Sequence, residues 1–363
     1  MDSMKASSRS KARSEGSVTV HDIAAKLGVS AMTVSRALSG NGTVAKETRA
    51  KVLAAAEAMA YVPNLSAKVL KNARTQVLGM LVSETRSPHI AQVISAVSQC
   101  AVRAGQDLVI FLVADEPGVE SPRVLKLLGS GICDGLIVAV PKATKNTLDA
   151  IARGNIPAVL INYGKGGVQL PVVKGDNYDG ARQAVQHLLD LGHRRVAFVA
   201  GSTFSGQSPE RQRGYSDCLI EAGLEIDPTL IVQGEFHPAQ GYEQTLALLS
   251  LAKPPTAIFA ANDEMAIGVL DAVRVRGLKI PEDVSVVGFD DIPAASFVPP
   301  GLTTVRQPLE DIAQTAVSSV LNQLDTRAKD VRRVEFPSRL IVRGSTAPPA
   351  VARDLSGRNR KKN

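Results

Sequence analysis

Polar side chains stand at the ends of several apolar segments, where the edge of a sheet would gather them. Asn162 ends "PAVLIN", Asn262 ends "TAIFAAN" and Asp290 ends "VSVVGFD". Arg211 follows "RVAFVAG", and Phe236 is one of only eight phenylalanines in a chain without tryptophan. Carboxylate, amide and guanidinium groups bind adjacent hydroxyls through paired hydrogen bonds, and an aromatic face packs against C–H groups. These residue types predict a site for a polyhydroxylated small ligand.

The same residues also have a purely structural interpretation. Asn262 and Asp263 would cap the following helix, Arg211 would form a surface salt bridge, and Phe236 would belong to the core. The convergence of the whole set on strand ends favours a ligand site, and Asn262 and Asp263 can serve both purposes.

Sequence motifs of common enzymes and metal sites are missing. No G-x-G-x-x-G follows a strand, and there is no GxxxxGK[ST], HExxH or G-x-S-x-G. The five histidines show no ligand spacing, and the three cysteines, Cys100, Cys133 and Cys218, form no CxxC pair. We therefore expect neither catalysis, nor a cofactor, nor a bound metal, and we expect buried thiols.

Positive charge is concentrated at the start of the chain. Residues 1–75 hold 12 Lys and Arg against 5 Asp and Glu, whereas residues 76–363 hold 30 of each kind. Clustered positive charge neutralises phosphates, so this excess indicates binding to nucleic acid. A solvated basic arm is the alternative interpretation.

Residues 18–60 read as three short helices. Thr19 and Asp22 form a capping box for the first, and Gly28 stops it. Ser30 can cap a second helix, and a third is expected at about 46–60. The predicted inward residues of the third helix are Val52, Leu53, Ala56 and Met59. Two helices joined by a tight glycine turn predict a helix-turn-helix, with a plain three-helix bundle as the alternative.

From Val77 onward, apolar strands alternate with amphipathic helices. Predicted strands are 77–82, 108–113, 135–140, 157–162, 195–201, 256–262, 284–290 and 339–344. Continuous apolar strands separated by helices indicate parallel sheets covered on both faces. This number of strands and helices is too large for a single sheet. We therefore predict two doubly wound lobes, with a ligand cleft beyond the ends of the strands.

The chain resembles the lactose-repressor (LacI/GalR) family of bacterial transcription regulators over about residues 18 to 346. The carrying motifs are "VTVHDIAAKLGVSAMTVSRAL", "TRAKVLAAAEAMAYVPNLSAKVL", "FAANDEMAIGVL" and "DVSVVGFDDIPAASFVPPGLTTVRQP". The resemblance implies that the helix after Ser30 enters the major groove of operator DNA. Its base-facing positions would be Ala31, Met32 and Arg36, and its phosphate or base-edge positions Ser30, Thr33 and Ser35. Thr19 and His21 would lie beside the DNA backbone.

Further along, the resemblance implies a hinge helix that forms when two protomers sit on DNA. Leu70 would wedge into the minor groove, and Lys68 and Lys71 would reach phosphates. Asn64 and Ala67 complete the implied hinge contacts.

In the cleft, Asn162, Arg211, Phe236, Asn262 and Asp290 match effector-contacting positions of the family. The sequence departs from the family where "SPHI" (87–90) replaces an Asn-Pro-aromatic-aromatic stretch, which makes the near-lobe wall unusual. Asn162 stands where some members carry Asp, and Ala45 where a capping Ser is usual. The C-terminal tail lacks a leucine heptad, which favours a dimer over a tetramer.

The expected architecture is a small all-α helix-turn-helix headpiece followed by an α/β two-lobed, periplasmic-binding-protein-like domain. Its segments are a basic arm (1–17), the headpiece (18–62), a hinge (63–75), the two-lobed domain (76–346) and a basic tail (347–363). The first lobe is expected at about 76–174 and 291–325, and the second at about 175–290 and 326–346.

The expected function is a cytoplasmic, homodimeric transcriptional regulator. It would repress carbohydrate or sugar-acid genes from pseudo-palindromic operator DNA, under control of a sugar, sugar acid or sugar phosphate. No membrane segment is expected. A solute-binding protein of the same fold is the alternative, but it would need an export signal and no basic headpiece.

Overall fold

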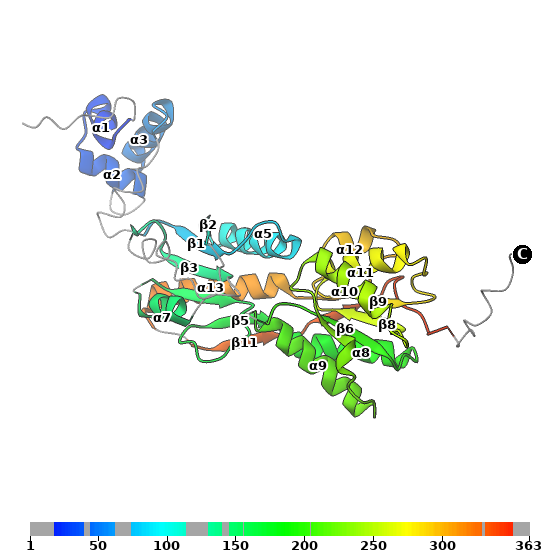
Figure 1. Cartoon of the computed structure of the whole chain (residues 1–363). Helices are drawn as coiled ribbons and strands as arrows, with labels where there is room; N and C mark the ends of the chain where they lie inside the picture. Colours follow the sequence, from blue (N-terminus) through cyan, green and yellow to red (C-terminus); the bar gives the residue numbers. More distant parts are fainter. Residues whose placement is uncertain are drawn as a thin grey trace, which may run out of the picture. The chain divides into compact units, whose positions relative to one another are not determined.

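The computed structural model describes residues 18–39, 44–61, 74–113, 130–139, 145–154, 156–203, 205–328 and 331–350. The chain divides into two compact units, Met1–Ala73 (unit 1) and Arg74–Asn363 (unit 2). Unit 1 contains the blue helices of Figure 1, and unit 2 contains the sheets. None of the helices in the described ranges has the length and apolar character that crossing a membrane requires.

Unit 1 packs three helices, α1 (Val20–Leu27), α2 (Ala31–Ser39) and α3 (Lys46–Ala58), around a small core. Thr19 and Asp22 close the predicted capping box on α1, and Gly28 ends the helix in the left-handed conformation at φ 66°. The backbone N–H of Thr33 donates to Ser30 Oγ at 3.0 Å, so Ser30 caps α2 as predicted. Ala45 offers α3 no side-chain cap.

The inward face of α3 differs from the prediction at one position. Leu53 is 48% exposed, whereas Ala55 is buried beside Val52 and Ala56. Residues 52, 55, 56 and 59 lie three or four apart and form one helical stripe, which position 53 falls outside. Placing Leu53 in the core was therefore wrong.

The first lobe of unit 2 is built on a six-stranded parallel sheet in the order β11-β5-β4-β3-β1-β2. Its strands are β1 (Val77–Val82), β2 (Asp107–Leu112), β3 (Gly135–Ala139), β4 (Ala158–Ile161), β5 (Val172–Gly175) and β11 (Arg333–Phe336). Alternate residues of β1 enter different clusters, Leu78 and Met80 one and Val77 and Leu81 the other. Both faces of the sheet are therefore covered at β1, as its apolar sequence predicts, whereas the edge strand β2 is largely exposed.

Among the described helices, three cover this sheet. Helices α5 (Pro88–Arg103) and α13 (Leu309–Thr326) pack together on one face, where Val93 and Val317 join the cluster around Met80. Helix α7 (Lys145–Arg153) contributes Leu148 and Ile151 to the cluster on the other face.

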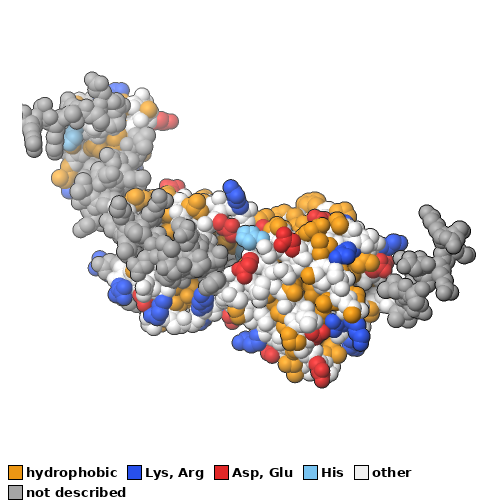
Figure 2. All heavy atoms as spheres, in the orientation of Figure 1, with side chains coloured by type: hydrophobic (Ala, Val, Ile, Leu, Met, Phe, Trp, Pro, Cys, Tyr) orange, Lys and Arg blue, Asp and Glu red, His pale blue; other side chains and the backbone are white. Residues whose placement is uncertain are grey.

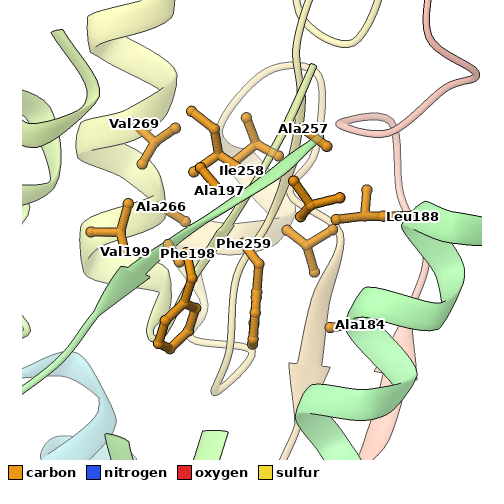
Figure 3. Close-up of a cluster of buried hydrophobic side chains, with 14 of the residues drawn as sticks. Ala184, Leu188, Ala197, Phe198, Val199, Ala257, Ile258, Phe259, Ala266 and Val269 are labelled. Atoms are coloured by element: carbon orange, nitrogen blue, oxygen red, sulfur yellow. The ribbon is translucent and has the colours of Figure 1, made fainter. Parts of the chain in front are cut away.

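The second lobe is a four-stranded parallel sheet in the order β7-β6-β8-β9. Its strands are β6 (Val196–Ala200), β7 (Ile231–Gln233), β8 (Ala257–Ala260) and β9 (Ser285–Val287). Its helices are α8 (Asn177–Asp190), α9 (Gln207–Glu221), η1 (Pro228–Leu230), α10 (Pro238–Leu248), α11 (Asp263–Val275) and α12 (Ala294–Phe297). Figure 3 shows Leu188 of α8 and Val269 of α11 approaching Phe198 and Ile258 from opposite sides of the strands.

The chain crosses between the lobes three times. It passes from β5 to α8, from β10 (Thr304–Arg306) to α13, and from β11 to β12 (Arg339–Ile341), which pairs antiparallel with β10. The prediction placed residues 326–346 in the second lobe, whereas β11 pairs in parallel with β5 of the first. A four-residue strand carries too little pattern to show which sheet it joins, so this boundary needs correction.

Candidate functional site

Helix α2 of unit 1 has one buried and one exposed face. Val34 and Ala37 face the core, whereas Met32 is 61% exposed and Arg36 is also exposed. Residues 32 and 36 lie four apart, so their side chains share one side of the helix. Two of the three predicted base-facing residues, Met32 and Arg36, therefore lie on an accessible helix face that carries both an apolar and a basic group.

The remaining predicted DNA contacts in unit 1 surround that face. Ser30 and Thr33 are joined by a hydrogen bond of 2.9 Å between their hydroxyls, and Ser35 and Ala31 are partly exposed. Thr19 and His21 are exposed at the start of α1, where the Thr19 hydroxyl also donates to Asp22 at 2.7 Å. The predicted hinge residues Asn64, Ala67, Lys68, Leu70 and Lys71 lie outside the described residues.

A cavity of about 420 Å³ lies between the two lobes of unit 2. The first lobe lines it with the segment between β1 and α5 and the start of α5, including Ser87 and His89. The second lobe lines it with residues that follow β6, β7, β8 and β9. Four of the five predicted effector contacts meet here: Arg211, Phe236, Asn262 and Asp290.

Arg211 is the fully buried centre of this site. Its Nε donates to Asn177 Oδ1 at 2.9 Å, its Nη1 to the carbonyl of Ala261, and its Nη2 to Asp290 Oδ1 at 3.3 Å. The guanidinium carbon lies 3.7 Å from the ring centroid of Phe289. The alternative of a surface salt bridge is excluded, because only 1% of Arg211 is exposed.

Asp290 receives several donors at the end of β9. Gln307 Nε2 donates to its Oδ1 at 2.7 Å, and His89 Nδ1, from the opposite lobe, lies 3.8 Å from the same oxygen. His89 Nδ1 is buried without a hydrogen-bond partner. Burial lowers the pKa of His89 below its ordinary value, although Asp290 opposes the shift. A neutral imidazole therefore faces the cavity and can bind a polar group of a ligand.

Asn262 caps α11 as predicted, and it also lines the cavity. Its Oδ1 accepts from the backbone N–H of Met265 at 2.9 Å and caps α11, while its Nδ2 donates to the carbonyl of Phe236 at 3.4 Å. Asp263 instead accepts from the Thr304 hydroxyl and from the backbone N–H of Ile292, so it holds the segment that crosses between the lobes.

Phe236 reaches the cavity because of an unusual backbone and a neighbouring glycine. Its φ is 65°, and a Cβ placed on Gly201 would overlap the Phe236 ring. Non-glycine residues with positive φ also end β4 and β9, at Asn162 (φ 53°) and Asp290 (φ 110°). Such conformations cost free energy and gather at functional sites, which marks these strand ends as more than connections.

Asn162 does not line the cavity with the other predicted contacts. Its backbone carbonyl accepts from Gln207 Nε2 at 2.9 Å, and Gln207 is the residue that faces the cavity. The Asn162 Nδ2 is buried without a hydrogen-bond partner. In this arrangement Asn162 stands behind Gln207.

Contacts between the lobes around the cavity include one further side-chain hydrogen bond and one close approach of backbones, in addition to the bond from Gln207 to Asn162. Ser87 Oγ donates to Glu264 Oε1 at 2.7 Å across the gap. At another point the backbones touch, because a Cβ placed on Gly164 would lie 2.5 Å from the carbonyl carbon of Gly206. Sequence reasoning did not identify Ser87, His89 or Glu264 as contacts, and the unusual "SPHI" stretch was the available signal.

No metal site accompanies the cavity in the described ranges, since no group of three or more His, Cys, Asp or Glu side chains there could hold an ion. The cysteines Cys100, Cys133 and Cys218 are free and buried, as expected.

Both units of the chain match known protein families. Residues 19–64 match the model described as "Bacterial regulatory proteins, lacI family", and residues 185–346 match "Periplasmic binding protein-like domain". The chain is 32% identical over 329 residues to the HTH-type transcriptional repressor PurR of Pasteurella multocida (strain Pm70), covering 90% of this chain and 98% of that protein.

Solved structures show the same similarity. The Lac repressor dimer bound to operator and the anti-inducer ONPF matches with a TM-score of 0.82 and 29% identity, over 92% of this chain and 100% of that one. A complex of the transcriptional regulator CelR with cellobiose matches with a TM-score of 0.68 and 30% identity, over 90% and 99% of the two chains.

Proposed function

Because the chain belongs to the lacI family of bacterial regulatory proteins, we propose that it represses transcription from a pseudo-palindromic operator as a homodimer. The exposed face of α2 reads bases through Met32 and Arg36, and the surrounding hydroxyls contact phosphates or base edges. The supporting observation is the presence, in one chain, of this accessible face and a cavity lined by both lobes of unit 2. A regulator that binds bacterial DNA works in the cytoplasm.

The hinge completes this proposal. Residues Asn64 to Lys71 form a helix when two protomers occupy the operator, Leu70 wedges into the minor groove, and Lys68 and Lys71 contact phosphates. Binding energy then comes partly from deformation of the central base steps.

The cavity holds the effector that controls DNA binding. Arg211, Asn262 and Asp290 supply hydrogen-bonding groups, and Phe236 supplies an aromatic face, a combination that suits a hydroxyl-rich molecule. The CelR–cellobiose complex supports a carbohydrate-like ligand, since that regulator shares the fold. A ligand that prefers one lobe arrangement shifts the population between DNA-binding and released states.

Selection of operator sequences from random DNA by the full-length protein tests the proposal. The selected sequences should share an inverted repeat. The log K for binding to them should fall steeply with log[salt], because the excess of positive over negative charge lies in residues 1–75. Recovery of sequences without a common motif, or a flat salt dependence, would show that the protein does not act on an operator.

A further inference from the structure

The charges around the effector cavity are unbalanced. Its described lining contains four carboxylates, those of Glu84, Glu235, Glu264 and Asp290, against two guanidinium groups, Arg86 and Arg211. Figure 2 shows acidic side chains and a histidine close together in the middle of unit 2. Because Arg211 pairs with Asp290, the described lining offers the three glutamates the exposed Arg86 and the imidazole of His237.

Glu264 is the most buried of the three glutamates. It is half-buried on α11, and its Oε1 accepts from Ser87 Oγ at 2.7 Å. It forms no ion pair with a lysine or arginine of the described chain. Burial raises the pKa of Glu264, and Asp290 and Glu84 raise it further. A buried carboxylate among like charges is stabilised by a cation, and an anion placed beside it is repelled.

Other lining groups indicate what else the ligand carries. Four serines, Ser83, Ser87, Ser202 and Ser205, line the cavity. The Ser205 hydroxyl is already bonded within its own loop, whereas the Ser87 hydroxyl, which donates to Glu264, can still accept from a ligand hydroxyl. The ring of Phe236 offers a face to an ammonium group or to C–H bonds. The buried Nδ1 of His89 is without a partner and can bond to one further polar group.

We infer that the effector is a small hydroxylated amine, such as an amino sugar, whose ammonium group binds beside Glu264 and Glu84. Sugar acids and sugar phosphates are excluded, because each adds negative charge to a cavity that already has an excess. This inference rests on the proposed function, since it assumes that the cavity is the effector site.

A charge-matched ligand panel tests the inference with the full chain. Glucose, galactose and mannose are compared with their 2-amino, N-acetylamino, 6-phosphate and aldonic acid counterparts by thermal shift and calorimetry. At least one amine should bind more tightly than its neutral parent, and no phosphate or acid should bind. Glu264→Gln, which keeps the acceptor for Ser87, should weaken binding of the amine by roughly 10- to 100-fold, the range for losing a charged hydrogen-bond partner. Glu282→Gln, at an exposed carboxylate, should change nothing.

Phe236→Ala separates failure of this inference from failure of the proposed function. If a neutral or anionic compound binds better than its amine counterpart and Phe236→Ala weakens that binding, the charge inference is wrong and the cavity remains the effector site. If a compound binds and Phe236→Ala does not weaken its binding, the cavity is not the effector site. If no amine in the panel binds, the inference is wrong. The regulatory function is then still tested separately, by the selection of operator sequences.

Discussion

Arg211 Nη2 lies 3.3 Å from Asp290 Oδ1, and both side chains are more than nine-tenths buried at the floor of the cavity. Arg211 comes from α9 and Asp290 from the end of β9, so this ion pair ties two segments of the second lobe together. A buried pair contributes little over an apolar substitute, but removal of one partner leaves the other as an uncompensated charge.

Asp290→Asn should therefore destabilise the protein strongly. The expected loss in the free energy of unfolding is about 3 to 5 kcal/mol, the range for breaking a buried ion pair on one side. Urea denaturation measures it, and Glu282→Gln serves as a control that also removes one negative charge. Equal stability of the two variants would mean that other groups neutralise the charge of Arg211 when Asp290 is lost.

Gly201→Ala should move the Phe236 ring. The added methyl group would overlap the ring carbons, and such overpacking costs about 1 to 3 kcal/mol of stability. In a Phe236→Ala background the same change should cost far less, because the ring has gone. Gly166→Ala, at a position with open space, is the control. Additive losses in the double variant would show that the contact is not the cause.

Arg36→Ala should weaken operator binding by roughly 10- to 100-fold, as expected for one base contact. Met32→Ala should instead change the preferred base at one position, because an apolar side chain reads thymine methyls. Fluorescence anisotropy with the selected operator and its single-base variants measures both effects. Leu53→Ala, which removes an exposed apolar side chain from α3, should leave affinity and preference unchanged.

Leu70→Ala should weaken operator binding more than binding to random DNA. A wedge that kinks a central base step contributes only where the operator is deformed, whereas phosphate contacts act on any sequence. Anisotropy titrations on both DNAs give the specificity ratio, with Lys68→Ala as the contrasting variant that should weaken both equally. An unchanged ratio for Leu70→Ala would refute the wedge.

Glu264→Gln should change how stability depends on pH. The folded state raises the pKa of Glu264 above 4.5, chiefly by burial, so it holds this proton more tightly than the unfolded chain does. That stabilisation is fully present below the unfolded pKa and is lost as the pH rises through the folded pKa. The free energy of unfolding of Glu264→Gln, relative to the unmodified protein, should therefore increase as the pH rises from about 4, near the unfolded pKa of a glutamate. A constant difference in urea denaturation as the pH rises would contradict the shift.

The sequence predicts the parts of the site that depend on local pattern. Strong apolar segments locate eight of the strands, and parallel strands end at a common edge, so the sequence alone groups Arg211, Asn262 and Asp290. The capping residues Thr19 and Ser30 likewise fix the starts of α1 and α2.

What the sequence misses depends on contacts between distant residues. Ser87 and Glu264 lie 177 positions apart, and their hydrogen bond follows only from how the lobes close. Asn162 is displaced from the cavity wall by Gln207, which a strand-end rule does not anticipate. Strands β5, β7, β10 and β11 have three or four residues each, too few to establish a periodicity.

The approach of Gly164 to Gly206 has a genetic consequence. The backbones of the two lobes are in direct contact there. A side chain at either position would therefore hold the lobes further apart. A protein with such a substitution would stay in one of its two states, DNA-binding or released, whichever small molecule is supplied. It would also be dominant in mixed dimers if both protomers must close together. These two glycines therefore mark where a screen for unresponsive regulators should find its mutations.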